Sequence, residues 1–110
     1  MKAADQPIST ELHIADGVFV KTMVIQRAGT FVPQHAHVYA HVTVLVRGSI
    51  KAWKDGAFLG DFTAPVGITI PARAKHLFMS LEDHTILLCV HDIGTAEAVE
   101  IAEEHQIVEG

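Results

Sequence analysis

Residues 42–63 read VTVLVRGSIKAWKDGAFLGDFT, three short runs of β-branched and aromatic residues separated by two glycine-containing turns. Short runs of this composition, without a sustained helical period, are typical of strands. Asp55-Gly56 is the strongest hairpin signal, because a glycine preceded by aspartate tolerates the positive φ of a tight hairpin turn. The stretch therefore predicts antiparallel strands joined by short turns.

The same pattern continues on both sides of this stretch. Strands are expected at residues 17–28, 42–47, 49–54, 57–63, 67–70, 76–81 and 85–91. Many short antiparallel strands at this spacing predict an all-β sandwich or barrel. After Gly94 the residues become good helix formers with Thr95 as an N-cap, which predicts a short C-terminal helix at about 95–105. The 110 residues suit a single domain spanning 1–110, with the barrel core at about 17–93.

The composition narrows the class of protein. Hydrophobic residues make up 49% and charged residues 19% of the chain, which is typical of a packed globule. The net charge of -5 and the scattered basic residues argue against nucleic-acid binding. No apolar run approaches the roughly 20 residues that cross a bilayer. Cys89 is the single cysteine, and residues 1–9 lack the apolar region of a secretory signal, so we expect a cytoplasmic protein without an internal disulfide.

Histidines are unusually clustered in this chain. Three of the eight, His35, His37 and His41, fall within seven positions. In a strand, His35 and His37 share a face at about 6.6 Å, close enough to chelate one ion. His41 has the same parity, but a straight strand would place it about 20 Å from His35, so the chain must bend if all three bind one metal. A helix would also align His37 with His41, although the neighbouring β-branched and aromatic residues favour a strand.

Two stretches of the sequence resemble the motifs of the cupin superfamily. Residues 29–48, GTFVPQHAHVYAHVTVLVRG, have the glycine and histidine spacings of the first cupin motif, with His41 where the family usually has glutamate. Residues 65–80, PVGITIPARAKHLFMS, resemble the second motif. Pro71 and His76 match that motif, whereas its usual glycines and asparagine are replaced by Pro65, Arg73 and Ser80. The two motifs and their connector span about half of the chain.

The resemblance implies a small single-domain, cupin_2-like conserved barrel protein with the double-stranded β-helix fold. It also implies one divalent transition metal inside the barrel, held by four histidines: His35, His37, His41 and His76. Imidazole ligation suits Fe, Mn, Ni, Cu and Zn alike, so the residue types do not name the metal. Four neutral imidazoles leave the charge of the ion uncompensated, which favours an anionic ligand in its open positions.

Small cupins of this kind are similar to metal-dependent oxygenases and related oxidoreductases acting on a small organic molecule, and we expect such a dioxygenase-like activity. Two alternatives stay open: a metal-dependent isomerase or lyase acting on a sugar or keto acid, and a non-catalytic module that senses a small ligand or a metal. No catalytic residue or proton carrier is identified. The candidates for lining the pocket are His91, Phe78 and Cys89. A homodimer through an open sheet edge is also expected.

Overall fold

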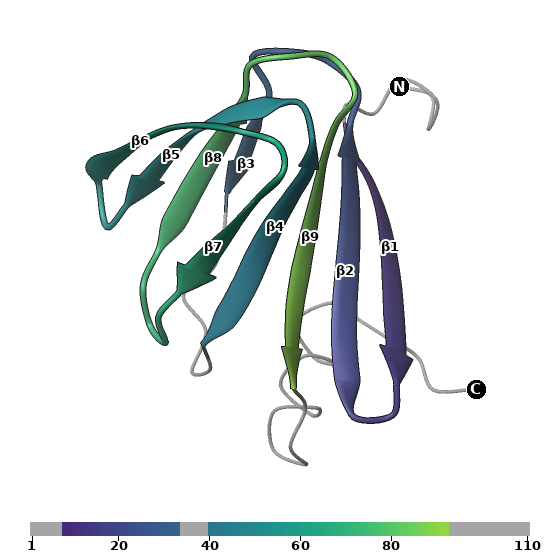
Figure 1. Ribbon diagram of the computed structural model, residues 1–110. Coiled ribbons are helices and arrows are strands. Elements are labelled where there is room, and N and C mark those ends of the chain that lie inside the picture. The colour runs from purple at the N-terminus through teal and green to yellow at the C-terminus, as the bar shows by residue number, and fades with distance from the viewer. Residues whose placement is uncertain (1–7, 34–39, 93–110) are drawn as a thin grey trace.

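A computed structural model describes residues 8–33 and 40–92, which form strands and no helix (Figure 1). No segment in these ranges is a helix long and apolar enough to cross a membrane. The strands are β1 Ile8–Ala15, β2 Val18–Ile25, β3 Phe31–Pro33, β4 His41–Arg47, β5 Ser49–Lys54, β6 Ala57–Thr63, β7 Val66–Ile70, β8 His76–Ser80 and β9 Thr85–Asp92. The predicted all-β fold class is confirmed.

The strands form two antiparallel sheets that face each other. One has the order β1-β2-β9-β4-β7 and the other the order β3-β8-β5-β6. In Figure 1 the sheets come together at the top and diverge toward the bottom, where β4 begins and β7 and β9 end. We call this lower end the open end. His76 begins β8 directly after the connection from β7, so it also belongs to the open end.

Two hairpins are closed by Asp-Gly turns. Asp55 and Gly56 have φ values of 48° and 84° and join β5 to β6, which confirms the predicted hairpin. Asp16 and Gly17, at 52° and 77°, join β1 to β2 in the same way. Positive φ at both central residues gives a turn whose twist matches that of the flanking strands. These turns therefore set the registers of both pairs.

The first strand differs from the expectation. β1 lies outside the predicted strands, and it places the start of the five-stranded sheet at Ile8 rather than at 17. It is an edge strand whose side chains are mostly exposed, so it contains no buried apolar run. The available signals were the alternation of Ile8, Thr10, Leu12 and Ile14 with more polar residues and the Asp16-Gly17 turn. The short β3 was not expected either, and the C-terminal helix expected at 95–105 lies outside the described residues.

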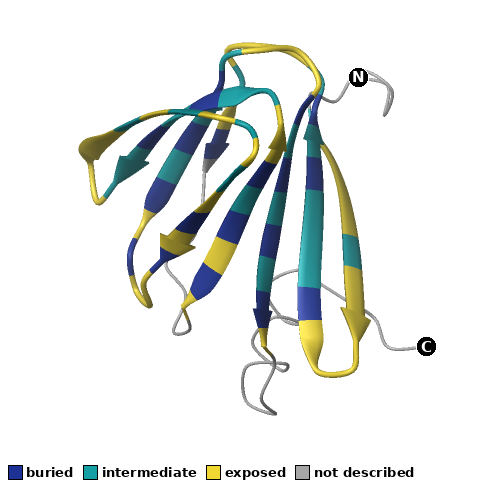
Figure 2. Ribbon diagram, viewed as in Figure 1, coloured by how far each residue is buried: buried dark blue, intermediate teal, exposed yellow. Residues whose placement is uncertain are grey.

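The hydrophobic core fills the space between the sheets. Figure 2 shows buried residues alternating with less buried ones along the inner strands, as expected when one face of each strand packs inward. The five-stranded sheet contributes Met23, Ile25, Leu45 and Leu87, and the four-stranded sheet contributes Val32, Ile50, Ala52 and Phe78. Buried polar side chains lie at both ends of this core, with His41, His76 and His91 at the open end and Ser80 and Thr85 at the opposite end.

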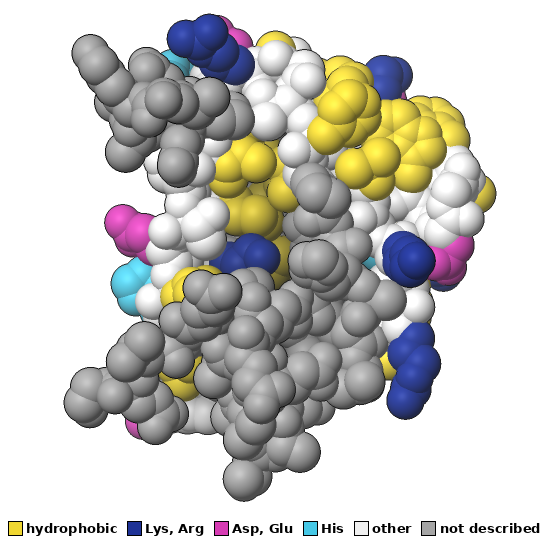
Figure 3. Space-filling view, turned by 180° about the vertical axis from the view of Figure 1, so that it is seen from behind, with side chains coloured by type: hydrophobic (Ala, Val, Ile, Leu, Met, Phe, Trp, Pro, Cys, Tyr) yellow, Lys and Arg dark blue, Asp and Glu magenta, His cyan; other side chains and the backbone are white. Residues whose placement is uncertain are grey.

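The outer face of the four-stranded sheet carries an aromatic cluster. The rings of Phe31 and Trp53 are 6.3 Å apart, and those of Trp53 and Phe58 are 5.9 Å apart. Phe31 and Phe58 are each more than half exposed. Figure 3 shows hydrophobic side chains gathered on the upper right of its surface. The nearby Lys51 ammonium lies 5.5 Å from the Phe58 ring and pairs with Asp61 at 3.1 Å.

Candidate functional site

Histidine side chains line the inner face of the five-stranded sheet at the open end. Phe19 on β2 pairs in register with His91 on β9, and His41 on β4 pairs with Ile70 on β7. The ladder between β4 and β9 reaches Val42–Val90, so His41 and His91 are the next residues toward the open end on neighbouring strands. All four inner side chains, Phe19, Ile70 and the two histidines, are buried. Two imidazoles therefore lie in one buried row between two apolar side chains.

His76 enters the same end from the facing sheet. It is buried, and its Nδ1 lies 3.3 Å from the carbonyl oxygen of Ala74. A carbonyl only accepts hydrogen bonds, so Nδ1 carries the proton and Nε2 carries the lone pair of the neutral ring. Burial lowers the pKa of His76, more than the Ala74 hydrogen bond and the Asp55 carboxylate raise it, and Lys54 lowers it further. The ring is thus held in the neutral form that binds metals.

His91 is oriented by a similar contact. Its Nδ1 lies 2.6 Å from the backbone oxygen of Asp92, which again makes Nδ1 the donor. The ring packs against Phe19, with the two ring centroids 5.1 Å apart. The Nδ1–H group of His91 is therefore directed at the backbone, and Nε2 is the acceptor nitrogen of the neutral ring.

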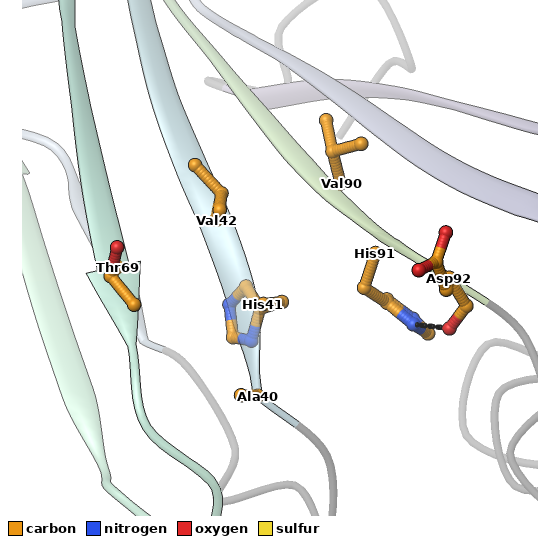
Figure 4. A pocket seen from close by; sticks show the side chains of 7 residues that line it. All are labelled: Ala40, His41, Val42, Thr69, Val90, His91 and Asp92. Atoms are coloured by element: carbon orange, nitrogen blue, oxygen red, sulfur yellow. Dashed lines mark hydrogen bonds between the residues drawn. The ribbon is translucent and has the colours of Figure 1, made fainter.

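A pocket of ≈330 Å³ lies at the rim where β4 begins and β9 ends (Figure 4). It is lined by Ala40, His41, Val42, Thr69, Val90, His91 and Asp92. Because Val42, Thr69 and Val90 alternate with the buried histidines, they belong to the outer face of the sheet. The pocket therefore curves around the sheet end and reaches the histidine row from outside. Its volume is in the range of small-molecule sites.

A second row of inward-facing side chains lies two residues further along these strands, away from the open end. Cys89 on β9 pairs in register with Lys21 on one side and Thr43 on the other. Its Sγ is 3.8 Å from the hydroxyl oxygen of Thr43, and both side chains are buried. Burial raises the pKa of the Cys89 thiol, although Lys21 and Thr43 act in the opposite direction. The thiol is therefore protonated at neutral pH and is a weak nucleophile.

The structure places the sequence-predicted residues as follows. His41 and His76 lie on facing sheets at the open end, whereas His35 and His37 lie outside the described residues. Within residues 8–33 and 40–92, no group of three or more His, Cys, Asp or Glu side chains is arranged to hold a metal ion. His91 lines the rim pocket, while Cys89 and Phe78 are buried in the core, with the Phe78 ring 6.1 Å from that of His76.

Lys21 was not among the sequence candidates. It has the parity of Phe19 and Met23 along β2, and it is partly buried.

Comparison with known proteins gives matches among solved structures. No protein-family model and no curated protein matches this chain. Its fold is similar to that of KdgF from Halomonas sp., with 12% identity, a TM-score of 0.67 and coverage of 81% of each chain. A cupin superfamily protein from Desulfitobacterium hafniense matches with 14% identity and a TM-score of 0.68 over 86% of this chain and 84% of that one.

An RmlC-like cupin with a double-stranded β-helix fold, from Methanocaldococcus jannaschii, matches with 15% identity and a TM-score of 0.65. That match covers 84% of this chain and 85% of the other. Identities at this level establish the shared fold and leave the activity open. The two facing sheets, their strand order and these matches together identify the chain as a protein with the double-stranded β-helix fold of the cupins.

Proposed function

We propose that this protein binds one divalent transition metal ion through His41 and His76 together with His35 and His37. We further propose that it is an oxygenase or related oxidoreductase acting on a small anionic organic molecule. The observation that carries the proposal is the pair of buried histidines, His41 and His76, which enter the open end from facing sheets.

The residues present fit a metal ion. The imidazoles of His41 and His76 are buried beside apolar side chains such as Ile70 and Phe78. His76 is neutral, and its Nδ1 is committed to the Ala74 carbonyl, which leaves Nε2 as the donor atom. Metal-ligating histidines commonly have their second nitrogen oriented by a backbone carbonyl in this way. The donor chemistry of the described residues therefore supports the proposed set.

Residues around the proposed metal ligands form the walls of the site and the pocket through which a substrate would enter. When bound, such an ion supplies Lewis acidity and, in the case of Fe, Mn or Cu, one-electron chemistry. Phe19 and Ile70 form apolar walls beside the histidine row and limit the access of water. His91 holds a fixed ring orientation through Asp92, and the rim pocket is large enough for a small organic molecule. Four neutral ligands would favour an anionic substrate.

Metal analysis tests the proposal. The protein is purified from unsupplemented cells, and a second sample is reconstituted with Fe, Mn, Ni, Cu or Zn. We expect about one ion per chain, lost in His41→Ala and in His76→Ala. His13→Ala is the matched control, because His13 is exposed and its ring lies 3.5 Å from Glu11 on β1. The absence of bound metal from both the native and the reconstituted wild-type protein would refute the site.

The reaction class is tested separately. An oxidoreductase contains redox-active Fe, Mn or Cu as purified and consumes oxygen or peroxide with some substrate. A protein that holds only Zn or Ni, with turnover independent of redox state, would instead be an isomerase or lyase. Stoichiometric ligand binding without turnover would identify a sensing module.

A further inference from the structure

The outward-facing side chains of β2, β9 and β4 form an aliphatic surface on the five-stranded sheet. They alternate along each strand with the residues that point into the core. The three strands are neighbours, so that Val90 on β9 lies in register between Val20 on β2 and Val42 on β4. We call the following residues the aliphatic face: Val18, Val20, Val24, Val42, Val44, Val46, Ile86, Leu88 and Val90.

The aliphatic face is open to solvent in the described structure. Val18, Val42 and Val46 are 36%, 38% and 46% exposed, and the other members are partly exposed. The four-stranded sheet packs on the opposite, inner face, and in Figure 1 no described strand lies in front of β2, β9 or β4. Monomeric proteins rarely expose continuous apolar patches larger than a few hundred Å².

The size of this surface suits an interface between two proteins. Three strands about 4.8 Å apart, each contributing about seven residues of about 3.4 Å, give the aliphatic face a flat footprint of about 340 Å². The flanking strands β1 and β7 enlarge the footprint of the sheet to about 570 Å². Two copies packed through this sheet would therefore bury about 1,100 Å², which exceeds the roughly 1,000 Å² expected of a specific interface.

Polar residues border the aliphatic face. On β1, beside β2, Glu11 and His13 form an ion pair of 3.5 Å. Arg47 and Asp92 lie at the ends of β4 and β9, and both are exposed. The surface thus has an apolar centre and a rim with charges of both signs, which is the usual anatomy of a protein–protein interface.

We propose that a second copy of this chain packs on the aliphatic face and forms a homodimer with a two-fold axis. A two-fold interface brings the same patch of both copies together, and a patch with an uncharged centre can meet itself without like-charge contacts. The two sheets have the same twist, so they can pack face to face about 10 Å apart. This dimer differs from the edge-to-edge dimer expected from the sequence, and it does not depend on the proposed metal site.

The second copy would also border the rim pocket. Val42, Thr69 and Val90 line that pocket from the outer side of the sheet, and the two valines belong to the aliphatic face. A partner packed on this face lies against the open side of the pocket and limits the access of water to it. The dimer therefore supplies an outer wall for a small molecule that approaches His41 and His91.

Analytical ultracentrifugation of the full-length protein over a wide concentration range tests the proposal. We expect a reversible dimer with twice the chain mass of 11.9 kDa. Leu88→Lys and Val44→Lys should each raise the Kd of the dimer at least about 100-fold, because each places an unpaired charge in an apolar interface. Phe58→Lys is the matched control, since Phe58 is 57% exposed on the other sheet. Circular dichroism checks that each variant is folded.

NMR spectroscopy identifies the contacting face. In a mixture of isotope-labelled and unlabelled chains, isotope-filtered NOEs should connect the methyl groups of Val20, Val44 and Leu88 to the partner. If a lysine variant does not fold, Val42→Lys takes its place, because Val42 is 38% exposed. The proposal is overturned if the wild type stays monomeric at NMR concentrations, or if the dimer persists unchanged in the folded lysine variants. NOEs from this face to residues 93–110 of a monomer would also overturn it, since the chain would then cover its own face.

Discussion

Replacing Gly48 by alanine should destabilise the protein more than the same change at any exposed turn glycine. Gly48 joins β4 to β5 with a φ of 89°. A Cβ atom there would collide with the hydroxyl of Thr85 and lie 3.1 Å from the Thr85 Cα. Thr85 is fully buried, and its hydroxyl donates a hydrogen bond of 2.9 Å to the Glu82 carbonyl. Thr85 therefore has little freedom to move away.

The expected loss is the sum of a backbone term and a packing term. Left-handed backbone costs an L-residue about 1–2 kcal/mol, and the smaller entropy of the unfolded alanine chain returns about 0.4–1 kcal/mol. Displacing the buried Thr85 adds about 1–3 kcal/mol for overpacking, together with about 1 kcal/mol if its hydrogen bond to Glu82 is lost. We therefore expect Gly48→Ala to lower the free energy of unfolding by about 3 kcal/mol, and Tm by more than about 10 °C.

Urea denaturation followed by circular dichroism measures the effect. Gly17→Ala and Gly56→Ala are the controls, because these glycines have φ values of 77° and 84° but no neighbouring atom within 4 Å of the added Cβ. They should lose only the backbone term, about 1 kcal/mol. Gly48→Ala should also cost less in a Thr85→Ala background. Equal losses at all three glycines would refute the packing argument.

Three further predictions concern the site. Removing metal with a chelator should lower the Tm of the wild type but not that of His41→Ala, since a ligand at 100 times its Kd adds about 2.7 kcal/mol; an unchanged wild-type Tm would contradict a bound metal. The raised pKa of Cys89 keeps the folded thiol protonated where the unfolded thiol ionises, so its contribution to stability should fall as pH rises above about 8.5. Calorimetry from pH 7 to 10 should show a shallower decline in Cys89→Ala, and identical slopes would rule this out. Lys21→Met should leave the free energy of unfolding within about 0.5 kcal/mol of the wild type or raise it; a larger loss in urea denaturation would give Lys21 a structural role.

The turns and most strands were predictable because their signals are local. The Asp55-Gly56 hairpin follows from the backbone freedom of two adjacent residues, and the strands on either side follow from their composition. β1 escaped prediction because an edge strand buries little and so contains no continuous apolar run. The alternation of its residues is present in the sequence, but only pairing with β2 gives the strand an inner face.

The face of a strand on which each side chain lies could also be predicted from the sequence, because successive residues alternate between the two faces. This alternation predicts that His76 and Phe78 share a face of one strand, and that Cys89 and His91 share a face of another, and the buried positions have these parities. The histidine spacing and the resemblance to cupin motifs indicated a metal-binding barrel, and the fold part of that expectation is confirmed. The ligand set itself remains a proposal.

Only the tertiary structure decided which strands became neighbours. The order β2-β9-β4 places Lys21, Cys89 and Thr43 in one interior row, although they are widely separated along the chain. Parity assigns a side chain to a face, but it does not say which strand lies beside it, because that pairing depends on long-range loop closure and on the packing of the whole core. The sequence by itself thus determined the turns and most strands, because their signals are local, whereas the pairing of the strands decided which side chains share an interior row.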